Sequence, residues 1–138
     1  MTELAALDPF DLPDWLGTGS VTWHARSADR TGFHVLGALV GGNGEEQPCD
    51  LVAVDRAFPA PVAGERTRQL AHQLWTNGQV LLVTYDGRPA LAVPGTGFSA
   101  DRVVDVLARL ARSVGARQES YVVALRLGVV RGDRGTGG

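Results

Sequence analysis

The sequence predicts an α+β domain in which two helices pack on a mostly antiparallel sheet. Three observations predict this class. An Asp-Gly dipeptide separates two apolar runs, as in a two-residue β-hairpin. Two segments, 61–77 and 99–114, carry apolar residues at helical spacing, and several short runs alternate in polarity. The expected order is β-β-β-α-β-β-α-β. Strands and helices therefore do not alternate strictly, which favours an antiparallel sheet with helices packed on it.

The first half of the chain contains an arm and three predicted strands. Residues 1–19 place apolar side chains among acids and prolines, so we expect a short arm that packs on the domain. Residues 21–27 alternate as a half-buried strand does, 33–40 are apolar on both faces, and 51–54 form a third strand. Between them, glycine and charged residues make 41–47 the most flexible loop that we expect.

The first predicted helix runs to about Asn77. Pro61 suits its first turn, because proline lacks the N–H that a helix start leaves unpaired. Gly78 is a natural end for the helix. Its inward face is expected to consist of Ala63, Thr67, Leu70, Ala71 and Leu74.

Asp86 and Gly87 form the turn of the predicted hairpin, since both positions of such a turn take positive φ. The register then places Tyr85 opposite Arg88 and apolar residues on both sides of the ribbon. The side rich in alanine should lie close under another element. Pro89 places its end of the ribbon at the margin of the sheet. The facing pairs expected further along are Leu82/Leu91 and Val80/Val93 on one side, and Leu81/Ala92 and Val83/Ala90 on the other.

The second predicted helix begins at Ser99, a good N-cap, and ends before Gly115. Its apolar face is expected to comprise Val103, Leu107, Leu110 and Val114. Residues 121–127 then alternate as a strand, and the connection to it from 90–93 through the helix would be a right-handed crossover if the two strands are parallel. We assign 20–128 to one domain and 129–138 to a disordered tail.

Composition excludes several classes of protein. The net charge of −2 gives no general attraction to nucleic acid or acidic lipid, and no apolar run approaches membrane-spanning length. With Cys49 as the single cysteine and no basic N-terminal region, we expect a cytoplasmic protein without an intramolecular disulfide. All 13 basic residues are arginine and isoleucine is absent, which indicates a GC-rich bacterial genome such as that of an actinomycete.

Four residues are candidates for a ligand or metal site: His24, His34, Cys49 and Asp55. If the turn after the first strand is centred near residue 29, the two histidines lie side by side, where Cys49 or Asp50 could join them. Zinc accepts such nitrogen and sulfur ligands. The competing interpretation is that His24 faces solvent and His34 is a polar residue at a strand start. No CxxC or HExxH motif occurs, and we expect neither a metal nor another cofactor.

A nucleophilic triad of Cys49, His72 and Asp55 is a further hypothesis. Helical geometry places His72 on the solvent side of its helix, with Glu65, Arg68 and Gln69, and so away from Cys49. Asp55 follows an apolar strand, where an acid more often caps a turn or forms an ion pair. We therefore assign no catalytic residue.

Aromatic residues and one arginine are candidates for an interface, since such residues are enriched in binding hot spots. Large aromatics are also usually mostly buried, so packing at the edge of the core is the competing interpretation. The candidates are Trp15, Trp23, Trp75, Tyr85 and Arg88.

The order of elements resembles that of the secretion-chaperone-like family, including its actinobacterial members. The likeness rests on three strands, a helix ending near Asn77-Gly78, the Asp86-Gly87 hairpin and a serine-capped helix with the sequence Asp-Arg-Val-Val-Asp from Asp101, and it covers roughly residues 20–115. The chain departs from the family by its strand at 120–127 and by the lack of a long N-terminal helix. The resemblance implies a homodimer that binds a partner polypeptide without catalysis.

Two functions therefore stay open. The first is a non-catalytic protein-binding module, chaperone-like or adaptor-like and with a homodimer as one form, motivated by strands that are apolar on both sides and by the absence of a catalytic motif. The second is a small-molecule- or metal-binding domain, or a small enzyme, that uses the His/Cys/Asp set. An exposed apolar sheet face would support the first, and a closed pocket with converging polar groups the second.

Overall fold

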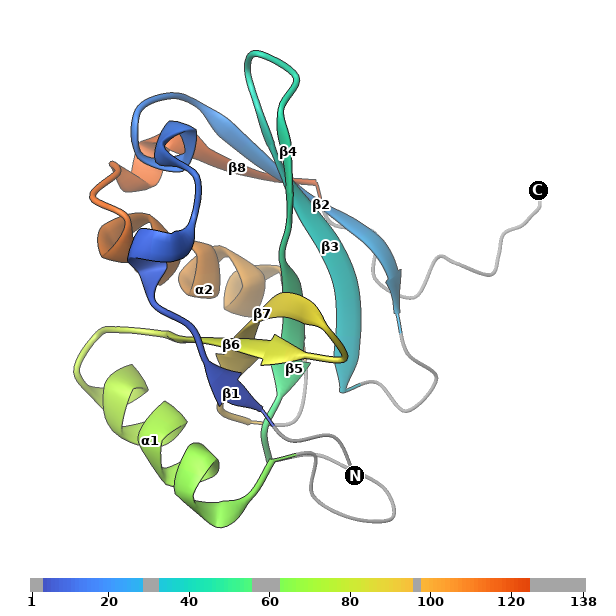
Figure 1. Cartoon of the computed structure of the whole chain (residues 1–138), viewed down its shortest axis with the longest axis vertical. Helices are drawn as coiled ribbons and strands as arrows, with labels where there is room; N and C mark the ends of the chain where they lie inside the picture. The colour runs from blue at the N-terminus through green and yellow to red at the C-terminus, as the bar shows by residue number, and fades with distance from the viewer. Residues whose placement is uncertain (1–3, 29–32, 56–62, 96–97, 125–138) are drawn as a thin grey trace.

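The sheet and both helices are present in the computed structural model, which describes residues 4–28, 33–55, 63–95 and 98–124. Eight strands form one sheet, accompanied by α1 (Glu65–Thr76) and α2 (Ala100–Ser113). Both helices lie toward the left of Figure 1, and strands of the sheet form its right-hand side. The predicted α+β class is confirmed. No helix in the described ranges is both long and apolar enough to cross a membrane.

The sheet is mixed, so the expectation of a mostly antiparallel sheet is wrong. Its strand order is β1-β6-β7-β5-β3-β2-β8, with β4 also paired to β3, and the pairs β5–β7 and β2–β8 are parallel. The predicted order of elements holds in part, because β1 and β4 are additional strands. The strands are β1 (Ala5–Ala6), β2 (Val21–Ala28), β3 (His34–Gly41), β4 (Glu46–Pro48), β5 (Asp50–Ala53), β6 (Leu81–Tyr85), β7 (Arg88–Val93) and β8 (Tyr121–Ala124).

The last strand lies at the far edge of the sheet from the hairpin, and α2 accounts for its position. The 14 residues of α2 correspond to a length of about 21 Å. The four strand spacings from β7 to β8 add up to about 19 Å. A helix of this length carries the chain across the face, so β8 pairs with β2, where it runs parallel to β7 four strands away.

The β6–β7 hairpin forms as predicted. Leu82 pairs with Leu91 and Tyr85 with Arg88, and the turn residues Asp86 and Gly87 have φ of 55° and 76°. The alanine side of the ribbon packs against α1, as expected for small residues under another element. β5 pairs with β7 only from Ala90 onward, so the end that carries the proline lies at the margin.

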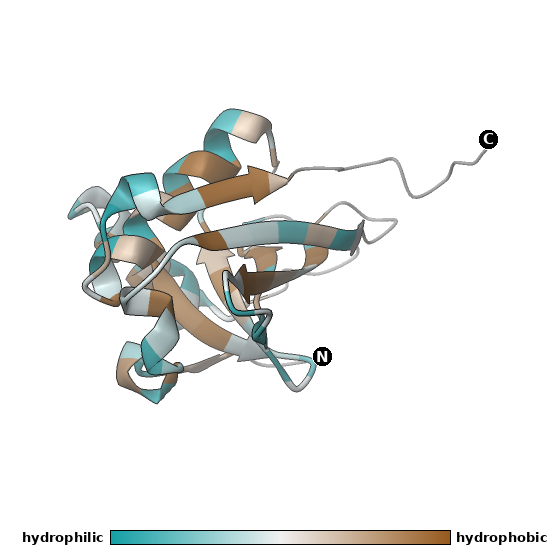
Figure 2. Ribbon diagram, turned by 90° about the horizontal axis from the view of Figure 1, so that it is seen from above, coloured by the Kyte–Doolittle hydropathy of each residue, from teal (hydrophilic) through white to brown (hydrophobic). Residues whose placement is uncertain are grey.

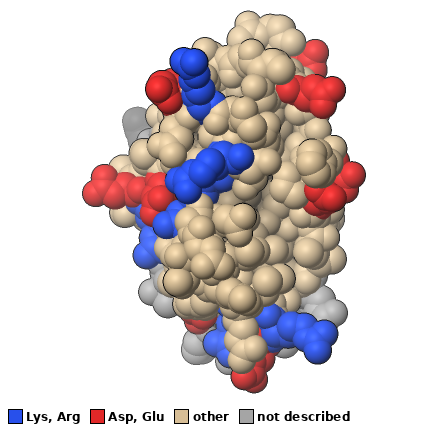
Figure 3. Space-filling model, turned by 90° about the vertical axis from the view of Figure 1, so that its left-hand side faces the viewer, with Lys and Arg blue, Asp and Glu red and all other residues tan. Residues whose placement is uncertain are grey.

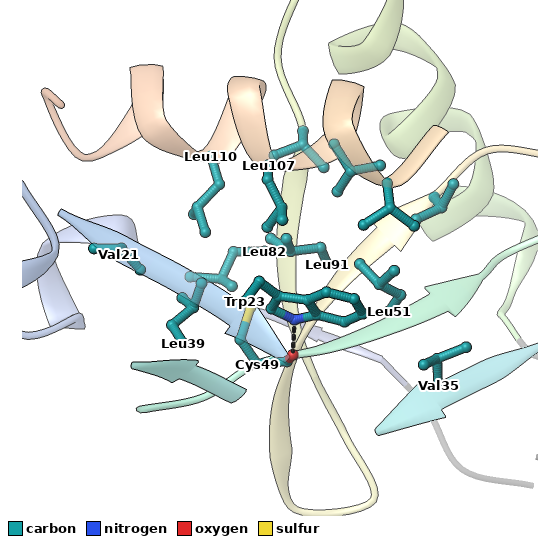
Figure 4. Packing of buried hydrophobic residues seen from close by; sticks show 14 of the residues in the cluster. Val21, Trp23, Val35, Leu39, Cys49, Leu51, Leu82, Leu91, Leu107 and Leu110 are labelled. Carbon is teal, nitrogen blue, oxygen red and sulfur yellow. Dashed lines mark hydrogen bonds between the residues drawn. The ribbon is translucent and has the colours of Figure 1, made fainter. Parts of the chain in front are cut away.

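The larger core lies between the sheet and α2. Figure 4 shows the indole of Trp23 at its centre, with Leu107 and Leu110 of α2 above it. Trp23 is fully buried and its Nε1 donates to the carbonyl oxygen of Cys49 at 2.9 Å. The helix begins as predicted, because the Ser99 hydroxyl accepts from the N–H of Arg102. We call this side of the sheet the α2 face; it includes Val21, Trp23, Val35, Leu39, Leu51, Leu82, Leu91 and Val93.

The opposite side, the α1 face, carries a smaller core under α1. This core contains Val52, Val54, Leu81, Val83, Ala90 and Ala92 of the strands with Ala71 of the helix. Leu70 was expected on the inward face of this helix but is 38% exposed, because the helix buries only a narrow stripe around Ala71. Gly78, with φ of 82°, ends the helix as predicted, whereas the expected start at Pro61 lies outside the described residues.

The N-terminal arm packs on the domain and contributes to the sheet. Its β1 pairs with β6, two short 3-10 helices, η1 (Pro9–Asp11) and η2 (Asp14–Gly17), follow it, and Leu16 is fully buried. The segment 41–47, expected to be a flexible loop, includes a tight turn and the start of β4. The predicted tail at 129–138 lies outside the described residues.

Candidate functional site

Half of the α1 face carries no helix in the described part of the chain. Trp23 of β2 pairs with Leu39 of β3, and both belong to the core on the α2 face. Because side chains alternate along a strand, their neighbours point to the other side. None of those neighbours belongs to the cluster that packs under α1. We call this surface the open half; its residues are Thr22, His24, Leu36, Ala38, Val40, Glu46, Pro48, Val122 and Ala124, and Glu46 forms an ion pair with Arg26.

The open half ends at an edge strand that is apolar throughout. β8 pairs with β2 on one side and, among the described residues, with nothing on the other. Figure 2 shows it as a brown strand at the margin of the sheet. Its four residues read Tyr-Val-Val-Ala, and Val122 is 57% exposed. Unpaired backbone groups and an exposed apolar side chain therefore lie together at this edge.

A buried polar cluster marks the border between the open half and the part covered by α1. Asp50, at the start of β5, is fully buried. Arg88 of β7 donates to it twice, from Nε at 2.8 Å and from Nη2 at 3.0 Å. The N–H of Gly37 donates at 3.0 Å, and Nε2 of His34 lies 3.1 Å away. The ring of Tyr85 lies edge-on to that imidazole, with centroids 4.7 Å apart.

Through Asp50, the cluster connects β5 to β3 and β7 near the junction between β4 and β5. Cys49 lies between them and its N–H donates to the carbonyl oxygen of Gly37. The N–H of Gly37 is instead bound by the Asp50 carboxylate. Burial by itself would raise the pKa of Asp50, but hydrogen bonds from His34, Arg88 and Gly37 outweigh it and hold the pKa below its ordinary value. The carboxylate is therefore ionised, and His34 must donate to it from Nε2.

Cys49 is placed as a core residue and lacks the features of a nucleophile. It is buried and packs in the core on the α2 face. Burial, with the negative charge of Asp50 beside it, raises the pKa of its thiol to about 12. A reactive cysteine needs an accessible site that favours the thiolate, and this site disfavours it.

Asp55 and His72 meet in the structure, away from Cys49. The imidazole Nε2 lies 2.6 Å from Asp55 Oδ2, which also accepts the N–H of Gly95 at 2.9 Å. Nη1 of Arg68 lies 3.8 Å from the other carboxylate oxygen. A surface hollow of about 310 Å³ adjoins the pair; it is lined by Asp55, Glu65, Arg68, Gln69 and His72. The α1 residues predicted on the solvent side of the helix, Glu65, Arg68, Gln69 and His72, therefore line this hollow. None of the lining residues carries a hydroxyl or thiol that could act as a nucleophile.

The four predicted ligand residues do not converge. His24 pairs with Ala38, four residues along β3 from His34, so the side-by-side arrangement of the two histidines on which the metal hypothesis depends does not form. The hairpin register is centred beyond residue 29. A bulge between Ala25 and Ser27 brings His24 closer to His34 by one position only, which does not close the gap. Within the described residues, no three His, Cys, Asp or Glu side chains are grouped so as to hold a metal ion.

The interface candidates have different environments. Trp23 is fully buried in the core on the α2 face, as in the competing interpretation that assigned these aromatic residues to packing. Trp15 packs against the core on the α2 face. The ring of Trp75 is covered by the guanidinium of Arg109, 3.5 Å from its centroid, so it joins the two helices. Of the five candidates, Tyr85 and Arg88 lie beside the open half, in the border cluster.

Sequence reasoning underestimated two features of this region. The sequence predicts Asp50 only as a possible companion of the two histidines in place of Cys49; its position at the start of an apolar strand is the available signal for a buried carboxylate. Val122 carried no signal by itself, because its exposure depends on β8 being an edge strand. Comparison of the chain with protein-family models, with curated proteins and with solved structures finds no match. The resemblance to the secretion-chaperone-like family stays a prediction.

Proposed function

We propose that this chain is a non-catalytic module that binds an extended segment of another protein, as a chaperone or adaptor does. The observation that carries the proposal is the open half of the sheet together with the edge of β8. An extended segment placed beside β8 would gain main-chain hydrogen bonds. Its alternate side chains would lie toward the apolar residues of the open half.

The composition of the edge supports this proposal. Natural proteins protect exposed edge strands with charges, prolines, bulges or covering loops, because an open edge pairs with other chains. β8 has no charge and no proline, and it exposes Val122. An edge without such protection among the described residues is suited to pairing.

The polar groups give less support to the alternative of a ligand site or small enzyme. The carboxylate of Asp50 is saturated by hydrogen-bond donors, and the thiol of Cys49 is buried. His24 lies on β2, whereas Asp55 follows β5 and pairs with His72 of α1. The proposal therefore assigns these groups to structure and the open half to binding.

Site-specific photocrosslinking tests the proposal. A photoreactive amino acid is placed at position 122 and, as a matched control, at position 104 on α2, because Val122 and Val104 are 57% and 54% exposed. In an extract of the source cells, we expect a discrete cross-linked protein from position 122 only. That protein is then purified and titrated against the wild-type chain.

The titration decides the outcome. Val122→Asp should weaken the binding of the purified protein at least about tenfold, because a carboxylate would replace an apolar contact. Val104→Asp should leave the affinity unchanged. Equal cross-linking from both positions, no cross-link from position 122, or full affinity in the Val122→Asp variant would each reject the proposal.

A further inference from the structure

A groove of about 560 Å³ separates the N-terminal arm from the C-terminal end of α2. It lies on the helical side of the molecule and is a different surface from the open half. Both of its walls have apolar parts, from the arm and from the last turn of the helix. The lining residues that matter here are Phe10, Leu12, Pro13 and Asp14 of the arm, and Arg112 and Val114 of the helix end.

Phe10 stands at the rim of this groove and is 93% exposed. Its backbone is nevertheless held in place. The N–H of Phe10 donates to Oδ1 of Asp8 at 3.0 Å, and the N–H of Leu12 donates to the carbonyl oxygen of Pro9 at 3.1 Å. A large aromatic side chain on a constrained backbone, next to an apolar groove, has the form of an anchor residue that is buried when a partner binds.

Opposite charges line the two walls. Asp14 lies on the arm and Arg112 on the helix end, and neither forms an ion pair with another described residue. Asp11 adds a second exposed acid to the arm. Figure 3 views this side of the molecule, with acidic side chains at both margins and arginine side chains left of the centre and at the bottom.

We propose that a second copy of this chain occupies the groove in a two-fold symmetric dimer. An isologous interface must be complementary to itself, and this surface carries the projecting Phe10, the groove, an acid and a base together. Across the axis, Phe10 of each copy enters the groove of the other, and Asp14 of each meets Arg112 of the other. The inference goes beyond the proposed function, because the dimer leaves the open half free.

Sedimentation equilibrium over about 1 to 500 μM tests the dimer, a range chosen for an interface of modest size. We expect reversible self-association of the wild-type chain. Phe10→Ala should weaken it at least about tenfold. Leu70→Ala, which truncates an exposed leucine on α1 outside the groove, should leave it unchanged.

Charge reversal tests the two-fold symmetry of the contact, because a symmetric contact predicts that a mixture of two variants associates although each variant alone does not. Asp14→Arg alone and Arg112→Asp alone should each lose association, because each homodimer would bring two like-charged pairs together. An equimolar mixture should recover it, since the two introduced side chains, of opposite charge, would face each other across the axis, as would the two native ones. A wild-type chain that stays monomeric throughout, or a mixture no better than its components, would overturn the dimer. Val122→Asp should leave the dimer intact, so this experiment and the cross-linking experiment fail independently.

Discussion

Replacing Asp50 by asparagine should lower the free energy of unfolding by about 3 kcal/mol, since it removes one partner of a buried ion pair. Asp50 is fully buried and binds three partners: His34, Gly37 and Arg88. An asparagine oxygen can still accept from the N–H of Gly37. Its neutral amide cannot serve as the charged acceptor for the imidazole and the guanidinium together.

The magnitude follows from what each partner can recover. Breaking a buried pair by removing one charge typically costs about 3–5 kcal/mol. The Arg88 side chain is 37% exposed, so its freed guanidinium can be partly hydrated. His34 is nearly buried and has less access to water. The lower end of the range therefore applies.

Urea unfolding followed by tryptophan fluorescence measures this change, since Trp23 is buried in the core. With a slope of about 1.5 kcal/mol/M, a loss of about 3 kcal/mol lowers the midpoint by about 2 M. Asp105→Asn is the matched control. Asp105 pairs with Arg109 one helical turn away and its side chain is 47% exposed, so the loss should be only about 0.3–0.5 kcal/mol.

The pH dependence supplies a second readout. The folded pKa of Asp50 lies below its ordinary value, whereas the unfolded value is about 3.9. The ionised carboxylate therefore stabilises the fold above about pH 5, and this contribution is lost as the pH falls through 4 toward the folded pKa. The asparagine variant should lack this part of the acid destabilisation. A midpoint change below about 0.5 M, or an unchanged acid profile, would refute the role assigned to Asp50.

Three other substitutions or reagents test the packing. Native Cys49 should resist a thiol-specific disulfide reagent at neutral pH and react fully after unfolding, because it is buried with a pKa of about 12; rapid native reaction would contradict this. Gly37→Ala should destabilise by about 2 kcal/mol, since its Cβ would lie 2.6 Å from the Trp23 ring, whereas Gly42→Ala, in open space, is the calorimetric control. Tyr121→Phe should cost about 1 kcal/mol in denaturant titrations, because its hydroxyl donates to the arm at 2.8 Å; no loss would show that this bond does not help hold β8.

Much of the candidate site lay beyond sequence reasoning. The alternation of residues 21–27 correctly placed Trp23 and His24 on opposite sides of a strand. It did not indicate which side a helix covers. Likewise Asp50 and Arg88 are 38 residues apart in sequence, and their pairing depends on β5 lying beside β7. Whether a helix covers the open half is a property of the assembled layers, so no local pattern predicts it.

The sequence by itself determined the elements that are stabilised by interactions between residues close in sequence. The Asp86-Gly87 turn adopts positive φ because glycine and aspartate tolerate it, and Ser99 caps α2 because its hydroxyl reaches a free N–H three residues on. Tertiary structure decided which strands became neighbours. β8 pairs with β2, a hundred residues earlier, because α2 spans the sheet and delivers it there. Pairing over such separations depends on the packing of every intervening element, and the open half and its edge result from it.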